Sequence, residues 1–365
     1  MQQAGRHQRT PGGLLLPMRA TLKGRIRWQV LDERGIPEVP RNPSGFPLAP
    51  AEGVEQPNLI TDLGLDQIAA ADCFGTDPGS SATWRRYLAV GTGSAAPSVG
   101  DTTLAAEVQR AASSGSFSNG STTYELDDTD DVWRAESLIT RLVTMNADRN
   151  IAEFGLSPES SGAIGVRELL RDGEGDPITV SLLNGKTLRV DHTLTVELPA
   201  PEAGTPATIN IAEYDAGNNL IGTTPLDVVY GGHVYLTGNE AWPFNVWNPS
   251  SANIQVVRRI TSALAYARQN AVTSQIDPDP NTISGDNVAL EAYVAGTHQR
   301  IKRRTIAAGS LNAAWYGFIV ASTSGGNFST NRSGWLVLFT DPASYTKQNT
   351  DTLRLGLVSS WARAA

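Results

Sequence analysis

The stretch Thr187–Leu198, TLRVDHTLTVEL, alternates without a break between apolar and polar positions. Its apolar side holds Leu188, Val190, His192, Leu194, Val196 and Leu198. This strict period of two predicts a long β-strand in a sheet that is covered on one side. His192 lies on the covered face, so we expect a histidine in the core or at a contact between subunits.

Other segments extend this pattern in both directions along the chain. Strands are expected at Gly24–Leu31, Arg86–Val90, Val132–Met145, Ile151–Leu156, Ala207–Tyr214, Leu226–Leu236, Val288–Val294, Trp315–Ala321, Trp335–Phe339 and Thr352–Val358. Helices are expected at Asn58–Ala71, capped by Thr61 or Asp62, and at Asp101–Ala111, capped by Asp101 or Thr102. Ile254–Arg268 suits a helix or a strand, and the Ser/Gly-rich Ala112–Thr123 reads as a flexible tip.

The sequence therefore predicts a mainly β protein with short helices (α+β). We expect tandem antiparallel modules like β-sandwiches, with an extended N-terminal arm. The length of 365 residues and the proline-flanked segment Pro199–Pro206 favour more than one domain. We divide the chain into a basic arm, strand and Pro-rich linker for attachment (1–57), an α+β module (58–200) and a mostly β module (201–365).

The last module resembles part of the one before it. Asp176-Pro177 precedes TLRV at Thr187–Val190 by the same offset at which Asp341-Pro342 precedes TLRL at Thr352–Leu355. A divergent internal repeat would explain this offset, and so would chance similarity between two strands.

Charge is unevenly distributed along the chain. The net charge of −8 argues against a general nucleic-acid binder, which needs clustered Lys and Arg. Met1–Leu31 nevertheless has no acidic residue, and it contains Arg6, Arg9, Arg19, Lys23, Arg25 and Arg27. This segment is either a solvated tail or an arm that docks on an acidic neighbour.

Metal and membrane signals are weak. The single cysteine, Cys73, excludes an internal disulfide and a multi-thiolate metal site. The acidic run Glu125–Asp131 (ELDDTDD) lacks the Gly and closing Glu of a calcium loop, so a solvated loop is favoured over a cation site. No apolar run is long enough to span a membrane. We expect no cofactor and no metal.

Tyr87–Arg110, YLAVGTGSAAPSVGDTTLAAEVQR, is the segment most suggestive of nucleotide chemistry. A phosphate loop needs a Lys and a hydroxyl after its last Gly, and no Lys follows Gly93. Ala96-Pro97 also interrupts the direct entry into a helix that a dinucleotide fold requires. We interpret the segment as a structural connection between a strand and a helix.

Enzymatic motifs are missing elsewhere too. The sequence has no GxSxG, no HExxH and no Cys–His pair. Trp242, Phe244 and Trp247 gather between prolines in AWPFNVWNP, either as rings that anchor a loop or as a surface for sugars or proteins. We expect the protein not to be an enzyme.

Three segments in a fixed order resemble a class of tailed-bacteriophage virion proteins. They are NLITDLGLDQIA (58–69), YLAVGTGSAAPSVGDTTLAAEVQR (87–110) and WRAESLITRLVTMNADRNIAEFGLSP (133–158). The ITV…TLRV…TLTVEL segment and the closing SWAR segment are also similar. The resemblance covers 58–198 and, more loosely, the C-terminal strand.

The resemblance implies a structural component of the virion, in a tail, neck or fibre, that acts through protein–protein assembly. Its expected partners are portal, adaptor, tail or capsid subunits and further copies of the chain, in a trimer or ring. It would be synthesised in the cytoplasm of the host bacterium. Two alternatives stay open: a capsid decoration protein, and a receptor- or glycan-binding module for host attachment.

Overall fold

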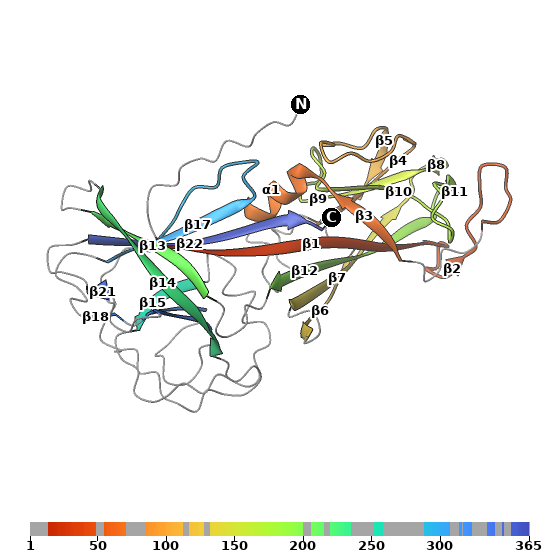
Figure 1. Cartoon of the computed structure of the whole chain (residues 1–365). Helices are drawn as coiled ribbons and strands as arrows, with labels where there is room; N and C mark the ends of the chain where they lie inside the picture. The colour runs from red at the N-terminus through yellow and green to blue at the C-terminus, as the bar shows by residue number, and fades with distance from the viewer. Residues whose placement is uncertain are drawn as a thin grey trace. The chain divides into compact units, whose positions relative to one another are not determined.

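The computed structural model describes residues 14–48, 55–70, 85–111, 117–127, 132–199, 206–214, 220–234, 252–257, 288–306, 314–315, 317–322, 334–339, 345–346 and 352–364. These residues form antiparallel strands and one helix, which confirms the predicted mainly β class (Figure 1). The chain divides into two compact units. Unit 2 comprises Arg19–Pro199, Tyr293–Gln299 and Ser360–Ala365, and unit 1 comprises Met1–Met18, Ala200–Ala292 and Arg300–Ser359.

One sheet of unit 2 is built on the strand that the sequence marks most clearly. This strand, β12 (Thr187–Pro199), lies between β7 (Val132–Thr144) and β1 (Leu14–Leu31), and β6 (Phe117–Asp127) pairs with the other edge of β7. His192 on β12 lies opposite Ile26 of β1 on one side and opposite Ile139 of β7 on the other. The apolar positions of the three long strands therefore share one buried face, as their period of two predicts.

The second sheet of unit 2 runs in the order β5 (Glu107–Arg110), β4 (Tyr87–Gly91), β9 (Glu153–Ser157), β10 (Val166–Leu169) and β3 (Gln56–Ile60). β3 also pairs with β1 at Gly24–Ile26, so the two sheets are continuous and curl around a common core. Buried side chains of that core include Leu22, Ile26, Trp28, Ile139, Val143, Leu88, Val90, Phe154, Leu156 and Val166.

The helix α1 (Asp62–Ala70) follows β3 directly. The Gly64 N–H donates to the Thr61 hydroxyl at 3.0 Å, which confirms Thr61 as the predicted cap. The helix starts at Asp62 rather than Asn58 because Gln56–Ile60 is drawn into strand pairing with β1 and β10. Leu65 and Ile68 are buried.

The C-terminal part of unit 2 covers α1. The Trp361 indole N–H donates to the Leu65 carbonyl at 2.9 Å, and its ring stacks on Tyr293 with centroids 6.1 Å apart. The Tyr293 hydroxyl donates to the Asp66 carboxylate at 2.5 Å, and Arg363 donates to the Ile60 carbonyl. Burial and the Asp66 carboxylate raise the pKa of Tyr293.

Short elements and turns connect β1 to β3, β7 to β9 and β10 to β12. They include β2 (Pro37–Glu38), β8 (Arg149–Ile151) and β11 (Val180–Leu182). Three turns of one design recur here, at 32–37, 42–47 and 172–177, with the pattern Asp or Asn, two residues, Gly, one residue and Pro. The side chains of Asp32, Asn42 and Asp172 each accept two backbone N–H groups within their turn. The Pro-rich linker expected within residues 1–57 therefore contains defined turns at 32–37 and 42–47.

Unit 1 contains a sheet in the order β15, β19, β20, β14, β13, β22, β17, β16, with every pair that is given a register antiparallel. The bounds are β13 Pro206–Tyr214, β14 Leu220–Val234, β15 Ala252–Val257, β16 Val288–Leu290, β17 Gln299–Ile306, β19 Gly317–Ser322, β20 Gly334–Phe339 and β22 Thr352–Arg363. The two short strands β18 (Ala314–Trp315) and β21 (Tyr345–Thr346) pair with each other.

Two local predictions are wrong, and a third, which left a helix and a strand open, is decided only at its start. The expected helix Asp101–Ala111 is a loop followed by β5, because Glu107–Arg110 pairs with β4. The expected tip Ala112–Thr123 contains the start of β6, which pairs with β7. Ile254–Arg268 begins within β15, so its start is a strand, and its remainder lies outside the described residues. Asp341-Pro342 also lies outside them, so the repeat stays a prediction.

Candidate functional site

The most highly organised polar site in unit 2 surrounds the loop between β4 and β5. Glu153 at the start of β9 is fully buried, and its carboxylate accepts backbone N–H groups of that loop. Its Oε1 accepts from Gly93 at 3.1 Å and from Ala106 at 2.8 Å, and its Oε2 accepts from Ala105 at 3.1 Å. One side chain thus fixes both ends of the loop.

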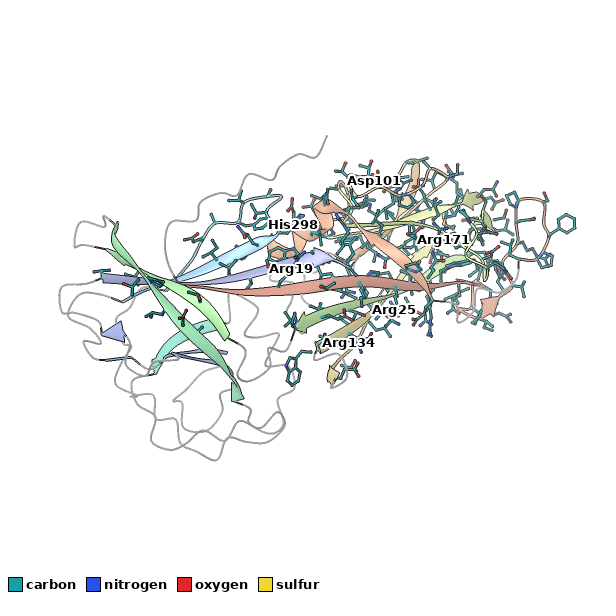
Figure 2. All side chains as sticks on the ribbon, viewed as in Figure 1. Arg19, Arg25, Asp101, Arg134, Arg171 and His298 are labelled. Atoms are coloured by element: carbon teal, nitrogen blue, oxygen red, sulfur yellow. The ribbon has the colours of Figure 1, made fainter. Side chains whose placement is uncertain are left out.

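Arg167 on β10 completes this site. Its Nε donates to Glu153 Oε2 at 3.0 Å, its Nη1 lies 2.5 Å from Asp101 Oδ2, and its Nη2 donates to the Ala95 carbonyl at 2.8 Å. Burial opposes the charge of this guanidinium, yet the carboxylates of Asp101 and Glu153 raise the pKa of Arg167. Figure 2 labels Asp101 on the loop. We call Asp101, Glu153 and Arg167 the acidic cluster.

Two glycines of the loop are required by the approach of Glu153. A Cβ atom on Gly91 would lie 2.5 Å from Glu153 Oε1, and one on Gly93 would lie 2.4 Å from the same atom. These contacts explain why the loop begins GTG. A phosphate-binding loop would direct its backbone N–H groups at a phosphate. In this loop, the N–H groups of Gly93, Ala105 and Ala106 donate to the Glu153 carboxylate instead, which supports a structural role for the loop.

A second buried cluster lies on the covered face of the first sheet. Arg85 Nη1 lies 2.8 Å from His192 Nδ1, and Arg85 Nη2 donates to the Ser137 hydroxyl at 3.1 Å. Arg141 donates through Nε to the Arg85 carbonyl at 2.7 Å. We call Arg85, Arg141 and His192 the basic cluster. All three are buried, which confirms His192 as a core histidine.

The basic cluster shifts proton affinity in the direction opposite to the acidic one. Burial, followed by the charges of Arg85 and Arg141, lowers the pKa of His192 well below its usual value of 6.5. Burial and then the charge of Arg86 lower the pKa of Arg141 to about 10. Because a guanidinium only donates, Nδ1 of His192 accepts, and the neutral imidazole carries its proton on Nε2.

Three of the residues expected to dock on an acidic neighbour, Lys23, Arg25 and Arg27, alternate with buried positions of β1 and so lie on the outer face of the first sheet; Figure 2 labels Arg25. Lys23 pairs with Glu197 at 2.8 Å, Arg25 with Glu136 at 2.6 Å, and Arg27 with Glu55 at 2.9 Å. Arg19 is exposed. Arg6 and Arg9 lie outside the described residues. Three of the six basic side chains are thus already engaged with carboxylates of the same unit.

The remaining candidate sites are only partly described. Trp242, Phe244 and Trp247 lie outside the described residues, as do 128–131 of the acidic run. Glu125 of that run pairs with Arg134 at 2.8 Å. Within the described part of the chain, no group of three or more His, Cys, Asp or Glu could hold a metal ion. No helix in that part is long and apolar enough to cross a membrane.

Sequence reasoning missed the role of Glu153 and Arg167. A signal was present, because IAEFGL places one acid in an otherwise apolar strand and VREL places one Arg beside apolar neighbours. Comparison of the chain with family models, curated proteins and solved structures finds no match.

Proposed function

We propose that this protein is a structural component of a tailed-bacteriophage virion, a tail, neck or fibre subunit that acts through protein–protein assembly. The observation that carries the proposal is a set of contacts. The three segments that resemble this class lie far apart in the sequence and are joined into one scaffold in unit 2 by the Glu153 carboxylate and by backbone hydrogen bonds.

The contacts involve all three segments. Glu153 of the AEFGL segment binds the backbone of the GTG…DTT segment. The Asp62 N–H of the NLITDLGL segment donates to the Val99 carbonyl of that same loop at 2.8 Å. Thr61 N–H donates to the Gly165 carbonyl, next to β10. The motif residues thus serve to hold one scaffold together, and a scaffold suits an assembly subunit.

The surface chemistry points the same way. Ion pairs cover the outer face of the first sheet. They are Lys23–Glu197, Arg25–Glu55, Arg25–Glu136, Arg27–Glu55, Arg134–Glu125 and Arg134–Glu197. A charge-paired β face is suited to packing beside the charged surfaces of neighbouring subunits.

The test uses phage particles from a host that carries the gene. Antibodies against the purified chain should label intact particles at the tail, neck or fibre, and mass spectrometry of purified particles should detect the chain at tens of copies. Hundreds of copies spread over the head would establish the decoration alternative instead. Particles that lack the chain altogether, while the host lysate contains it, would overturn the proposal.

A further inference from the structure

Unit 2 displays a concentrated group of exposed apolar side chains on its turns. Seven large hydrophobic side chains are exposed among the described residues, and four of them are Ile36 (51%), Val39 (54%), Phe46 (67%) and Leu183 (55%). Single exposed apolar side chains are normal on protein surfaces, whereas a concentration of them indicates an interaction site. We call these four residues the turn surface.

Bonds between the segments hold the four residues in one region. The Ser181 N–H donates to the Arg41 carbonyl at 2.8 Å, and Lys186 pairs with Glu38 at 2.7 Å. The Lys186 N–H in turn donates to the Leu183 carbonyl at 3.1 Å. Figure 1 shows β2 and the connection that follows it at the same end of unit 2 as β8 and β11.

Two of the four side chains are presented in the same rigid way. Ile36 and Phe46 occupy the same position in the turns 32–37 and 42–47, between Gly and Pro. The Ile36 N–H is held by the Asp32 carboxylate at 2.8 Å, and the Phe46 N–H by the Asn42 amide oxygen at 3.0 Å. Gly35 and Gly45 have φ of 78° and 82°, as this turn requires. Such pre-organisation lowers the entropy lost on binding.

Charges around the turn surface are balanced. Its segments carry the acids Asp32, Glu33, Glu38 and Asp148 and the bases Arg34, Arg41, Arg149 and Lys186. A partner of one dominant charge would gain little from such a rim. Arg34 pairs with Asp32 at 3.0 Å and Lys186 pairs with Glu38 at 2.7 Å, so these charges are neutralised within the chain. An identical surface carries the same neutral pairs, and a second copy can approach it without net repulsion.

We propose that the turn surface is a self-association site, at which a second copy of this chain docks through the same four residues. The apolar centre supplies burial, and the mixed rim sets the orientation. The inference goes beyond the proposed function and does not depend on it, since it rests on exposed side chains, turn geometry and charge balance alone.

The test compares the full chain with a substituted chain by sedimentation velocity over a concentration series. The parent chain should show a mass that rises with concentration, and Phe46→Ser should weaken the association at least ten-fold, because a symmetric contact loses both rings. Ile36→Ser provides a second variant. Circular dichroism should be unchanged for both, as the replaced side chains are exposed.

Asp176→Ser is the matched control, because Asp176 occupies the equivalent position in the third turn of the same design. It should leave the association unchanged, as should Leu138→Ser on the outer face of β7. A parent chain that stays monomeric at every concentration would overturn the proposal. Equal association of the parent and Phe46→Ser chains would overturn it too.

A charge exchange distinguishes a second copy from other occupants. Arg34→Glu with Lys186→Glu makes the rim acidic, and Glu33→Lys with Glu38→Lys makes it basic. Each double variant alone should associate more weakly than the parent, and an equimolar mixture should associate more strongly than either. A mixture that behaves as the average of its two components would refute the self-complementary rim.

Discussion

The acidic cluster and the basic cluster of unit 2 both bury charge, and they stabilise it in different ways. In the acidic cluster, Glu153 and Asp101 face Arg167, and each charge is bonded to the opposite charge or to backbone N–H groups. In the basic cluster, Arg85 and Arg141 lie beside His192 and bond to carbonyl oxygens and to the Ser137 hydroxyl.

The pKa values of the buried side chains differ between the two clusters in the same way. Paired carboxylates raise the pKa of Arg167, whereas burial and neighbouring positive charge lower the pKa values of Arg141 and His192. The acidic cluster therefore keeps its guanidinium charged, and its Glu153 carboxylate fixes the loop between β4 and β5. The basic cluster keeps its histidine neutral, and it makes the core of unit 2 sensitive to acid.

The strongest way to break the acidic cluster is Glu153→Gln. This change leaves Arg167 without its buried carboxylate and places an amide N–H against backbone N–H groups, so we expect a loss of about 3–5 kcal/mol in the free energy of unfolding. Urea denaturation followed by circular dichroism measures it. Glu136→Gln, on the outer face, should cost about 0–1 kcal/mol. Equal costs for the two variants would show that burial of Glu153 does not matter.

A smaller effect tests the fit of the loop around that carboxylate. Gly93→Ala would place a methyl group 2.4 Å from Glu153 Oε1 and 2.6 Å from the Ala105 Cβ, so we expect a loss of about 1–3 kcal/mol. Gly100→Ala in the same loop meets nothing within 4 Å and should change stability by only a few tenths of a kcal/mol, about the size of an ordinary surface substitution. Thermal unfolding of the two variants decides whether the close approach is real.

The basic cluster should reveal itself through pH. His192 has a lowered pKa in the folded state, so the unfolded chain binds more protons below its value of 6.5. The contribution of His192 to the free energy of unfolding is therefore fully present above pH 6.5. It falls as the pH drops, by up to about 1.4 kcal/mol per pH unit. His192→Asn keeps an acceptor for Arg85 and should remove this slope between about pH 6.5 and 5. A slope that persists unchanged would assign the acid sensitivity to other groups.

Exposed charge pairs provide the smallest effect and complete the comparison with the buried clusters. Arg27, whose side chain is 52% exposed, pairs with Glu55, which is 33% exposed. Arg27→Gln should cost about 0.2–1 kcal/mol, and the difference should shrink in high salt. Urea midpoints at low and high salt measure it. A cost that salt leaves unaltered would mean that the pair acts through packing.

The sequence predicts the long strands of unit 2 well, because a one-sided sheet leaves a period of two in the chain. The strands β1, β7 and β12 are visible for this reason, and Thr61 reveals the start of α1 by its chemistry. The strand β5 is missed because Leu104, Ala105 and Val108 also suit a helix, and only pairing with Ala89–Gly91 decides between them.

The acidic cluster is harder to predict for a related reason. Glu153 lies 60 residues after Gly93 and 14 before Arg167, and nothing in the local pattern says that these residues meet. Strand order brings them together, because β9 lies between β4 and β10. The acidic cluster depends on which strands are neighbours in the sheet, whereas each long strand is marked by the alternation of apolar and polar residues within its own segment.

The cover of α1 has a consequence for synthesis. Trp361 bonds to Leu65 across a separation of 296 residues, and Arg363 reaches back to Ile60. A ribosome would therefore release Asp62–Ala70 long before its cover exists, and the apolar side of α1 would wait exposed while the intervening chain is made. Folding of unit 2 therefore requires translation to proceed through Trp361, which makes a chaperone useful during that interval and makes chains interrupted before Trp361 prone to aggregate.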